Sequence, residues 1–158
     1  MNKNNHPQKK FMLAAIDVAK KESKKYGEWK FGAVVVKDNK IISKSGNRVF
    51  RDIDPSGHAE ICAMKLAAKK LGTKYLHNCV LYTTNEPCCM CVGAAVWAEM
   101  DGIVFGANSK DLEKEFKKQK NPNMFIIPAA EILKKQGTKK MFLIRNFMRM
   151  ECKNLHGW

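Results

Sequence analysis

The 158-residue sequence lacks a long apolar run. No stretch approaches the ~20 apolar residues that a membrane-spanning helix needs. The start, MNKNNHPQKK, is polar and basic and is not followed by the apolar segment of a secretory signal. We therefore expect a cytoplasmic protein with no membrane partner. Repeats and Pro- or Gly-rich linkers are also absent, which predicts one domain over residues 1–158, with a flexible start at 1–8 and a variable helical part at 107–158.

Arginine is scarce, although the chain is strongly basic. Its formal net charge is +14, and only four of its 29 Lys and Arg residues are arginines: Arg48, Arg51, Arg145 and Arg149. Arginine is the forked side chain that binds phosphates and bases in a bidentate way, whereas lysine is a point charge. The lysines are spread along the chain, which favours solvated helix faces. A surface for a polyanion such as tRNA is the alternative interpretation.

Cysteine, by contrast, is crowded into one place. The segment NEPCCMC, residues 85–91, holds three of the six cysteines. An even number of cysteines is compatible with three disulfides. Clustered cysteines near a histidine, without a secretion signal, instead favour a metal site in a reducing compartment.

Hydrophobic periodicity predicts helices that alternate with strands. Helices are expected at residues 11–25, 58–71, 87–99, 110–120, 129–136 and 145–156. Strands are expected at residues 31–37, 41–46, 80–84, 102–106, 124–127 and 141–144, with a hairpin turn at Asp38 and Asn39. Strands that alternate with helices indicate a layered α/β fold.

The fragments His58-Ala59-Glu60 and Pro87-Cys88-Cys89-Met90-Cys91 contain the groups with distinctive chemistry. On a helix that begins at Pro87, Cys88 and Cys91 share a face, whereas Cys89 is rotated by about 100° and is expected to pack into the core. Two thiolates and one imidazole neutralise Zn²⁺. Three protein ligands leave a position for water, as in catalytic zinc sites. A fourth ligand would make the site structural; the candidates are His6, His77 and His156.

Glu60 follows His58 by two residues, which places a carboxylate beside the expected metal without making it a ligand. Such a group can accept a proton from a water whose pKa the metal has lowered to ~7, and pass that proton to a substrate. The alternative is a surface acid near the start of a helix. The neighbouring ligand pattern favours the catalytic role.

A His-x-Glu motif followed by Pro-Cys-x-x-Cys is the signature of zinc-dependent nucleobase deaminases. Over residues 31–106, which include FGAVVV, DPSGHAE, LYTTNEPCCMC, GAAVWA and IVFG, the sequence resembles the cytidine deaminase-like superfamily. It looks most like guanine and purine nucleoside deaminases, with tRNA adenosine deaminases as relatives. The resemblance implies a three-layer α/β/α sandwich with a mixed five-stranded sheet, usually a homodimer. It also implies Zn²⁺ at His58, Cys88 and Cys91, and proton transfer by Glu60.

The same resemblance implies a set of substrate contacts. Asn47 would hydrogen-bond the substrate and Phe31 would pack against a purine, while Trp97 matches a tryptophan of the guanine branch. The backbone N–H of Ala59 and the backbone C=O of Glu86 would face the base and the leaving amine. The alternatives are a turn residue for Asn47, a core residue for Phe31, and a core or dimer contact for Trp97.

The C-terminal region departs from guanine deaminase, because it lacks an evident equivalent of that enzyme's pocket-closing Asp. Here Trp158 or His156 would form a lid or simply pack. We expect a hydrolytic deaminase of a purine base or nucleoside of the guanine type, which releases ammonia. The alternatives are a tRNA adenosine-to-inosine deaminase and a non-catalytic zinc-stabilised or RNA-binding module.

Overall fold

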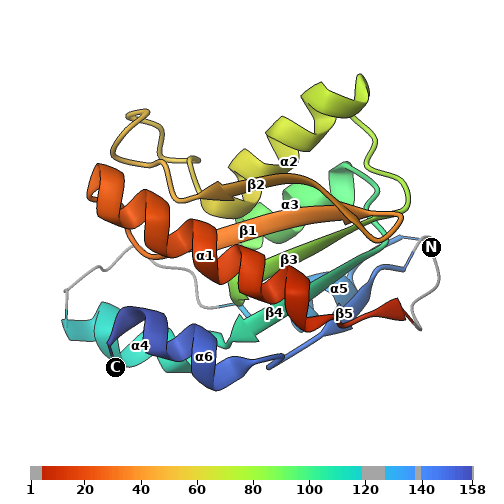
Figure 1. Cartoon of the computed structure of the whole chain (residues 1–158). Coiled ribbons are helices and arrows are strands. Elements are labelled where there is room, and N and C mark those ends of the chain that lie inside the picture. The colour runs from red at the N-terminus through yellow and green to blue at the C-terminus, as the bar shows by residue number, and fades with distance from the viewer. Residues whose placement is uncertain (1–4, 119–126, 138–139, 158) are drawn as a thin grey trace.

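A mixed five-stranded sheet forms the centre of the computed structural model, which describes residues 5–118, 127–137 and 140–157, without the side chains of 114–118. The strand order is β2-β1-β3-β4-β5 (Figure 1). Strand β1 pairs antiparallel with β2 and β3, whereas β3, β4 and β5 run parallel. The strands are β1 (Gly32–Lys37), β2 (Lys40–Gly46), β3 (Cys79–Asn85), β4 (Gly102–Ala107) and β5 (Phe142–Ile144).

Helices cover both faces of this sheet, so the predicted three-layer α/β/α sandwich is confirmed (Figure 1). Helices α1 and α6 contact one face, and α2 covers the other together with α3 and α5. The helices are α1 (Lys9–Tyr26), α2 (Ala59–Leu71), α3 (Cys89–Trp97), α4 (Ser109–Lys118), α5 (Ala129–Lys134) and α6 (Arg149–Lys153), followed by the 3-10 turn η2 (Asn154–His156).

The core lies in two layers, one on each side of the sheet. Successive side chains of a strand point to opposite faces. Val34 and Val36 of β1 therefore pack in the cluster beneath α1, whereas Ala33 and Val35 pack with α2. All residues of β3 and β4 are buried, as expected for strands covered on both faces.

Helix α1 packs directly on the backbone of β1. A Cβ atom added to Gly32 would collide with the carbonyl oxygen of Ala15 and would lie 2.9 Å from Cβ of Ala19. This close approach needs a residue without a side chain at position 32. It fixes the position of α1, and the loop that follows α1 leads into the candidate site.

Most of the predicted elements are confirmed, and the hairpin turn has positive φ angles of 48° at Asp38 and 60° at Asn39, the backbone of a two-residue β-hairpin turn. The predicted helix over 145–156 begins only at Arg149, because φ is positive at Asn146 and Met148. Of the strand predicted over 124–127, residues 124–126 lie outside the described residues, and Ile127 is not in a strand.

The expected flexible start does not extend to His6. This side chain is 8% exposed, and its Nδ1 lies 2.6 Å from the hydroxyl of Tyr82 in the core beneath α1. The first four residues lie outside the described part of the chain. Within the described part, none of the helices has the length and apolar character needed to cross a bilayer.

Candidate active site

The three predicted metal ligands lie at the first turns of α2 and α3. His58 is the N-cap residue of α2, Cys88 is the N-cap residue of α3, and Cys91 lies in the first turn of α3. Unpaired N–H groups give the start of a helix a partial positive charge, which stabilises thiolates. The loop before α2 ends at His58, and strand β3 leads to Cys88. Two ligands that are 30 residues apart in sequence therefore lie close together.

The spacing of the three ligand atoms fits zinc. His58 Nδ1, Cys88 Sγ and Cys91 Sγ lie 3.6 Å from one another in each pair. Tetrahedral zinc with Zn–S near 2.3 Å and Zn–N near 2.0–2.1 Å holds such atoms about 3.6–3.8 Å apart. Among the described residues, these three form the one group with metal-ligand spacing, and all six cysteines are free thiols.

The histidines considered as a fourth ligand lie elsewhere. His6 contacts Tyr82, the imidazole of His77 contacts Glu99, and that of His156 contacts Asn85. The cluster therefore has three protein ligands among the described residues, which is the number found in catalytic zinc sites.

The electrostatics of the cluster favour a thiolate at Cys88. Its pKa is lowered to about 4, because Cys91 and His58 hydrogen-bond the sulfur. The pKa of Cys91 is raised by the adjacent Cys88 sulfur and by burial. The pKa of His58 is raised by its contact with Cys88. A metal ion held by both sulfurs deprotonates both thiols, since coordination removes their protons.

Glu60 lies in the first turn of α2 and is buried beside this cluster. Its Oε1 accepts a hydrogen bond of 3.0 Å from the hydroxyl of Thr83, and its Oε2 lies 3.6 Å from Cys91 Sγ. Burial raises the pKa of Glu60. A carboxyl group whose pKa is raised toward neutrality can both accept and return a proton, which is the requirement for general acid–base catalysis.

Cys89 points away from the ligands, as its rotation on the helix predicts. The expectation that it packs in the core is wrong: Cys89 is half-buried and belongs to neither core cluster. The neighbouring Met90 is 37% exposed.

Phe31 and Asn47 are joined to each other and, through Arg48, to the residue before His58. The backbone N–H of Asn47 donates to the carbonyl of Phe31 at 3.1 Å, which joins the end of β2 to the start of β1. The next residue, Arg48, donates its N–H to the carbonyl of Gly57 at 2.8 Å, immediately before the ligand His58. These backbone contacts link both predicted substrate-binding residues to the start of α2.

The ring of His156, at the end of the described chain, packs 5.0 Å from the ring of Phe31. Its Nε2 lies 3.3 Å from Oδ1 of Asn85, the last residue of β3. Burial lowers the pKa of His156 to about 4, so the ring is neutral at physiological pH. Of the two roles considered for His156, the structure shows packing against Phe31.

Glu86 has a role that its sequence context did not indicate. Its carboxylate accepts the backbone N–H of Ser109 at 2.8 Å and of Ala129 at 2.9 Å, and so holds the starts of α4 and α5. Ala59 is fully buried as the first residue of α2. The substrate contacts expected of the Glu86 carbonyl and the Ala59 N–H stay predictions.

Trp97 is not brought to the cluster. It is the last residue of α3, it is 85% exposed, and it lies about 13 Å along the helix axis from Cys88 at ~1.5 Å per residue. It is also not in the core, which was one of the alternatives.

Two further polar residues support the site and were not identified from the sequence. Thr83 holds Glu60, and Glu28, which is 3% exposed, accepts a hydrogen bond of 2.9 Å from Nδ2 of Asn47. Thr83 lies in the LYTTNEPCCMC segment, but nothing in that segment indicated a role for it, and Glu28 lies outside the motifs named above. The alternation of β3 did place Thr83 on the same face as Leu81, but nothing local indicated the partner of Glu28.

A metal site of this composition beside a buried carboxylate, on a three-layer sandwich, is typical of zinc-dependent deaminases. A model of the zinc-binding region of cytidine and deoxycytidylate deaminases matches residues 5–107. The chain therefore belongs to this family of zinc-binding deaminases, and its residues His58, Cys88 and Cys91 are placed to hold the zinc ion.

Relatives of two kinds are similar to the chain. A tRNA-specific adenosine deaminase from Aquifex aeolicus is 44% identical over 100 residues, which cover 63% of this chain and 66% of the relative. A guanine deaminase from Bacillus subtilis is 46% identical over 81 residues, which cover 51% of this chain and 52% of the relative. The chain thus aligns with less than two thirds of the length of each of these relatives.

A solved structure from work on A-to-I editing by tRNA:A34 deaminases superposes with a TM-score of 0.71 and 26% identity. It covers 94% of this chain and 99% of the other. Because relatives of both kinds match, the comparisons show the family but leave two substrate classes.

Proposed function

We propose that the protein is a zinc-dependent hydrolytic deaminase of a purine base or nucleoside, with a guanine-type substrate favoured, and that it releases ammonia. The observation that carries this proposal is the buried Glu60 carboxylate. It is held by Thr83 and lies within 3.6 Å of a sulfur of the three-ligand cluster. A structural metal site has no use for an acid in that position.

Each group of the chain has a distinct part in such a reaction. His58, Cys88 and Cys91 would hold the zinc ion. When bound, the ion would supply Lewis acidity that lowers the pKa of water to ~7. Glu60 accepts a proton from the attacking water and donates it to the ring nitrogen of the base. The water oxygen bonds to the amino-bearing carbon. The C–N bond then breaks, and Glu60 delivers the second water proton to the departing amine.

A flat purine suits the residues that border the cluster. Phe31 and His156 offer aromatic surface, and Asn47 offers an amide that can hydrogen-bond an edge of the base. A site that combines an apolar face with a few polar groups is typical of small-molecule recognition.

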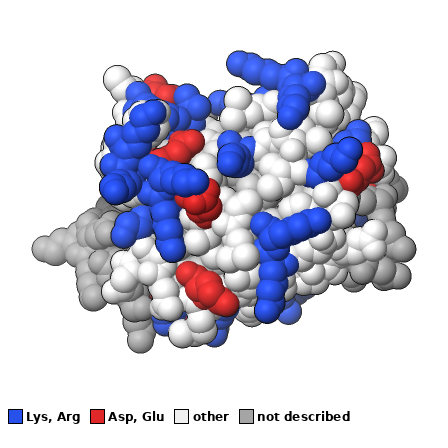
Figure 2. Space-filling model, viewed as in Figure 1, with Lys and Arg blue, Asp and Glu red and all other residues white. Residues whose placement is uncertain are grey.

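The arginines favour a free purine over tRNA. Arg48 forms an ion pair with Asp52 at 2.7 Å, and Arg51 pairs with Glu22 at 3.3 Å. Their guanidinium groups are thus engaged within the chain and are less available for phosphates. On the face shown in Figure 2, lysines and arginines form separate groups interspersed with acidic side chains, without a continuous basic strip.

A substrate panel tests this proposal. Ammonia release is measured with guanine, guanosine, adenine and adenosine, and inosine formation is measured with tRNA. We expect turnover of a free amino-purine, reduced about 10²- to 10⁴-fold by Glu60→Gln with zinc content unchanged. Glu131→Gln, at an exposed position of α5, is the matched control. Turnover confined to tRNA would transfer the proposal to RNA editing, and no turnover of any purine would refute it.

We also propose that the protein forms a homodimer through α3. Met90 and Trp97 are exposed on one side of this helix, and a Cβ on Gly93 between them would meet nothing within 4 Å. Exposed apolar groups at helical spacing are typical of a helix that packs on a partner. Light scattering should show a dimer that Trp97→Lys converts to a monomer; an unchanged mass for the variant would contradict this interface.

A further inference from the structure

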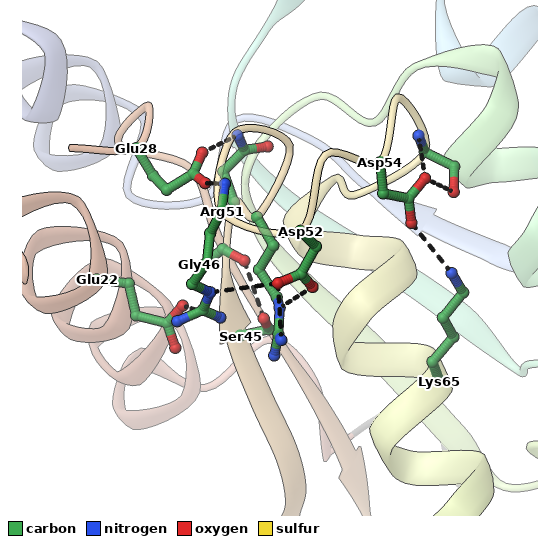
Figure 3. A network of polar contacts seen from close by, with 11 residues as sticks. Glu22, Glu28, Ser45, Gly46, Arg51, Asp52, Asp54 and Lys65 are labelled. Carbon is green, nitrogen blue, oxygen red and sulfur yellow. Dashed lines mark hydrogen bonds and ion pairs between the residues drawn. The ribbon is translucent and has the colours of Figure 1, made fainter. Parts of the chain in front are cut away.

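Glu28 is a buried carboxylate whose oxygens both accept hydrogen bonds. It lies between α1 and β1 and is 3% exposed. Its Oε2 accepts from Nδ2 of Asn47 at 2.9 Å, and its Oε1 accepts from the backbone N–H of Arg51 at 2.7 Å (Figure 3). Burial of a carboxylate is unfavourable unless hydrogen bonds replace its hydration, so these two bonds account for its presence there.

The bond to Asn47 determines how the amide is turned. An amide has a donor end and an acceptor end, whereas an ionised carboxylate only accepts. Glu28 therefore holds the nitrogen of Asn47 toward itself. In the proposed reaction, the amide oxygen and the second N–H hydrogen of Asn47 would contact the base. A base presents a fixed pattern of donors and acceptors, so recognition by Asn47 depends on which end of its amide points outward.

The surrounding network fixes Glu28 relative to the site. The Arg51 guanidinium carbon lies 4.1 Å from the centre of the Tyr26 ring. Arg51 also pairs with Glu22, so the loop that holds it is attached to α1 (Figure 3). On the other side, Lys65 of α2 pairs with Asp54 at 3.5 Å. The loop between β2 and α2 is thereby tied both to α1 and to the helix that begins after His58.

We propose that Glu28 is a positioning residue that orients the amide of Asn47 for the substrate base. The proposal rests on the proposed function, since it assigns Asn47 to base recognition in that reaction. Glu28 acts through Asn47 and takes no part in proton transfer. Its loss should therefore weaken substrate binding and leave the chemical step nearly intact.

Glu28→Gln is the informative substitution, because it preserves size and retains an acceptor for Arg51. Its amide nitrogen would face Asn47, and a hydrogen bond forms there only if the Asn47 amide turns over. We expect KM for the purine substrate to rise about 10- to 100-fold, with kcat changed less than about threefold. Zinc content and melting temperature should match the wild type. Glu28→Asp, which retains an ionised acceptor, should recover part of the lost affinity.

Two comparisons make the result specific. Glu22→Gln retains an oxygen that can accept from Arg51, does not touch Asn47 and should leave KM unchanged. In an Asn47→Ala background, Glu28→Gln should have no further effect on KM, since the amide it orients is gone. Additive effects of the two substitutions would overturn the proposal, as would a joint loss of kcat, zinc and thermal stability in Glu28→Gln and Glu28→Asp. If the wild-type protein turns over no purine, the proposed function fails, and this inference fails with it.

Discussion

The hydroxyl of Thr83 lies 3.0 Å from Oε1 of Glu60 and donates a hydrogen bond to that carboxylate. The bond connects Thr83 on β3 to Glu60 on α2, the proposed carrier of protons. It stabilises the charged form of Glu60 and so opposes the rise in pKa that burial causes. Burial is the largest influence on the pKa of Glu60 and raises it, and the hydrogen bond from Thr83 is one of the smaller influences that lower it.

Thr83→Val should shift the pH dependence of catalysis. Loss of the hydrogen bond raises the pKa of Glu60 further, and Glu60 must be deprotonated to accept a proton from water. The acidic limb of the profile of kcat/KM against pH should therefore move to higher pH, with a larger loss of rate at pH 6 than at pH 8. Thr84→Val removes a buried hydroxyl from the same strand without touching Glu60, and its acidic limb should stay in place. If the acidic limb does not move in Thr83→Val, Thr83 does not influence the pKa of Glu60.

Cys88→Ser and Cys89→Ser form a matched pair that separates a ligand from its neighbour. Cys88→Ser should reduce the affinity for zinc by at least about tenfold. It should also lower the melting temperature, because metal binding contributes to folding. Cys89→Ser should retain zinc, since Cys89 is not in the cluster. Zinc is measured by elemental analysis after dialysis against a weak chelator. Equal zinc loss in both variants would show that the assignment of ligands is wrong.

Gly32→Ala should destabilise the fold, because the added methyl group collides with the backbone of α1 at Ala15. We expect the free energy of unfolding to fall by about 1–3 kcal/mol, as for other overpacked cores. Urea denaturation followed by circular dichroism measures it. Gly137→Ala is the control, because nothing lies within 4 Å of a Cβ at that position. Similar stabilities for the two variants would contradict the close packing of α1.

The protein should lose stability as the pH falls below about 6.5, the ordinary pKa of histidine. Burial lowers the pKa of His156 to about 4 in the folded state. Between these values the unfolded chain binds a proton that the folded chain excludes, so acid favours unfolding. His156→Gln cannot titrate and should flatten the change in unfolding free energy between pH 7 and pH 5. An unchanged dependence of the unfolding free energy on pH in His156→Gln would contradict this prediction.

The sequence predicted the ligands and the layers because both follow from local rules. A capped helix start places Cys88 and Cys91 on one face, and alternation of strands with helices dictates the layers. Local rules could not predict the contacts of Glu28 and His156. Their partners Asn47 and Asn85 lie 19 and 71 residues away, and contacts of that kind form only when the whole sheet assembles. Trp97 illustrates the opposite case: a match to a motif predicted its role, but its place at the far end of α3 separates it from the metal.

The packing of His156 on Phe31 has a practical consequence for handling the protein. A purification tag fused after Trp158 would begin three residues after His156, whose ring packs on the proposed substrate contact Phe31. Because a histidine tag also chelates zinc, such a fusion would complicate measurements of zinc content. Material for kinetic work is better labelled at the opposite terminus.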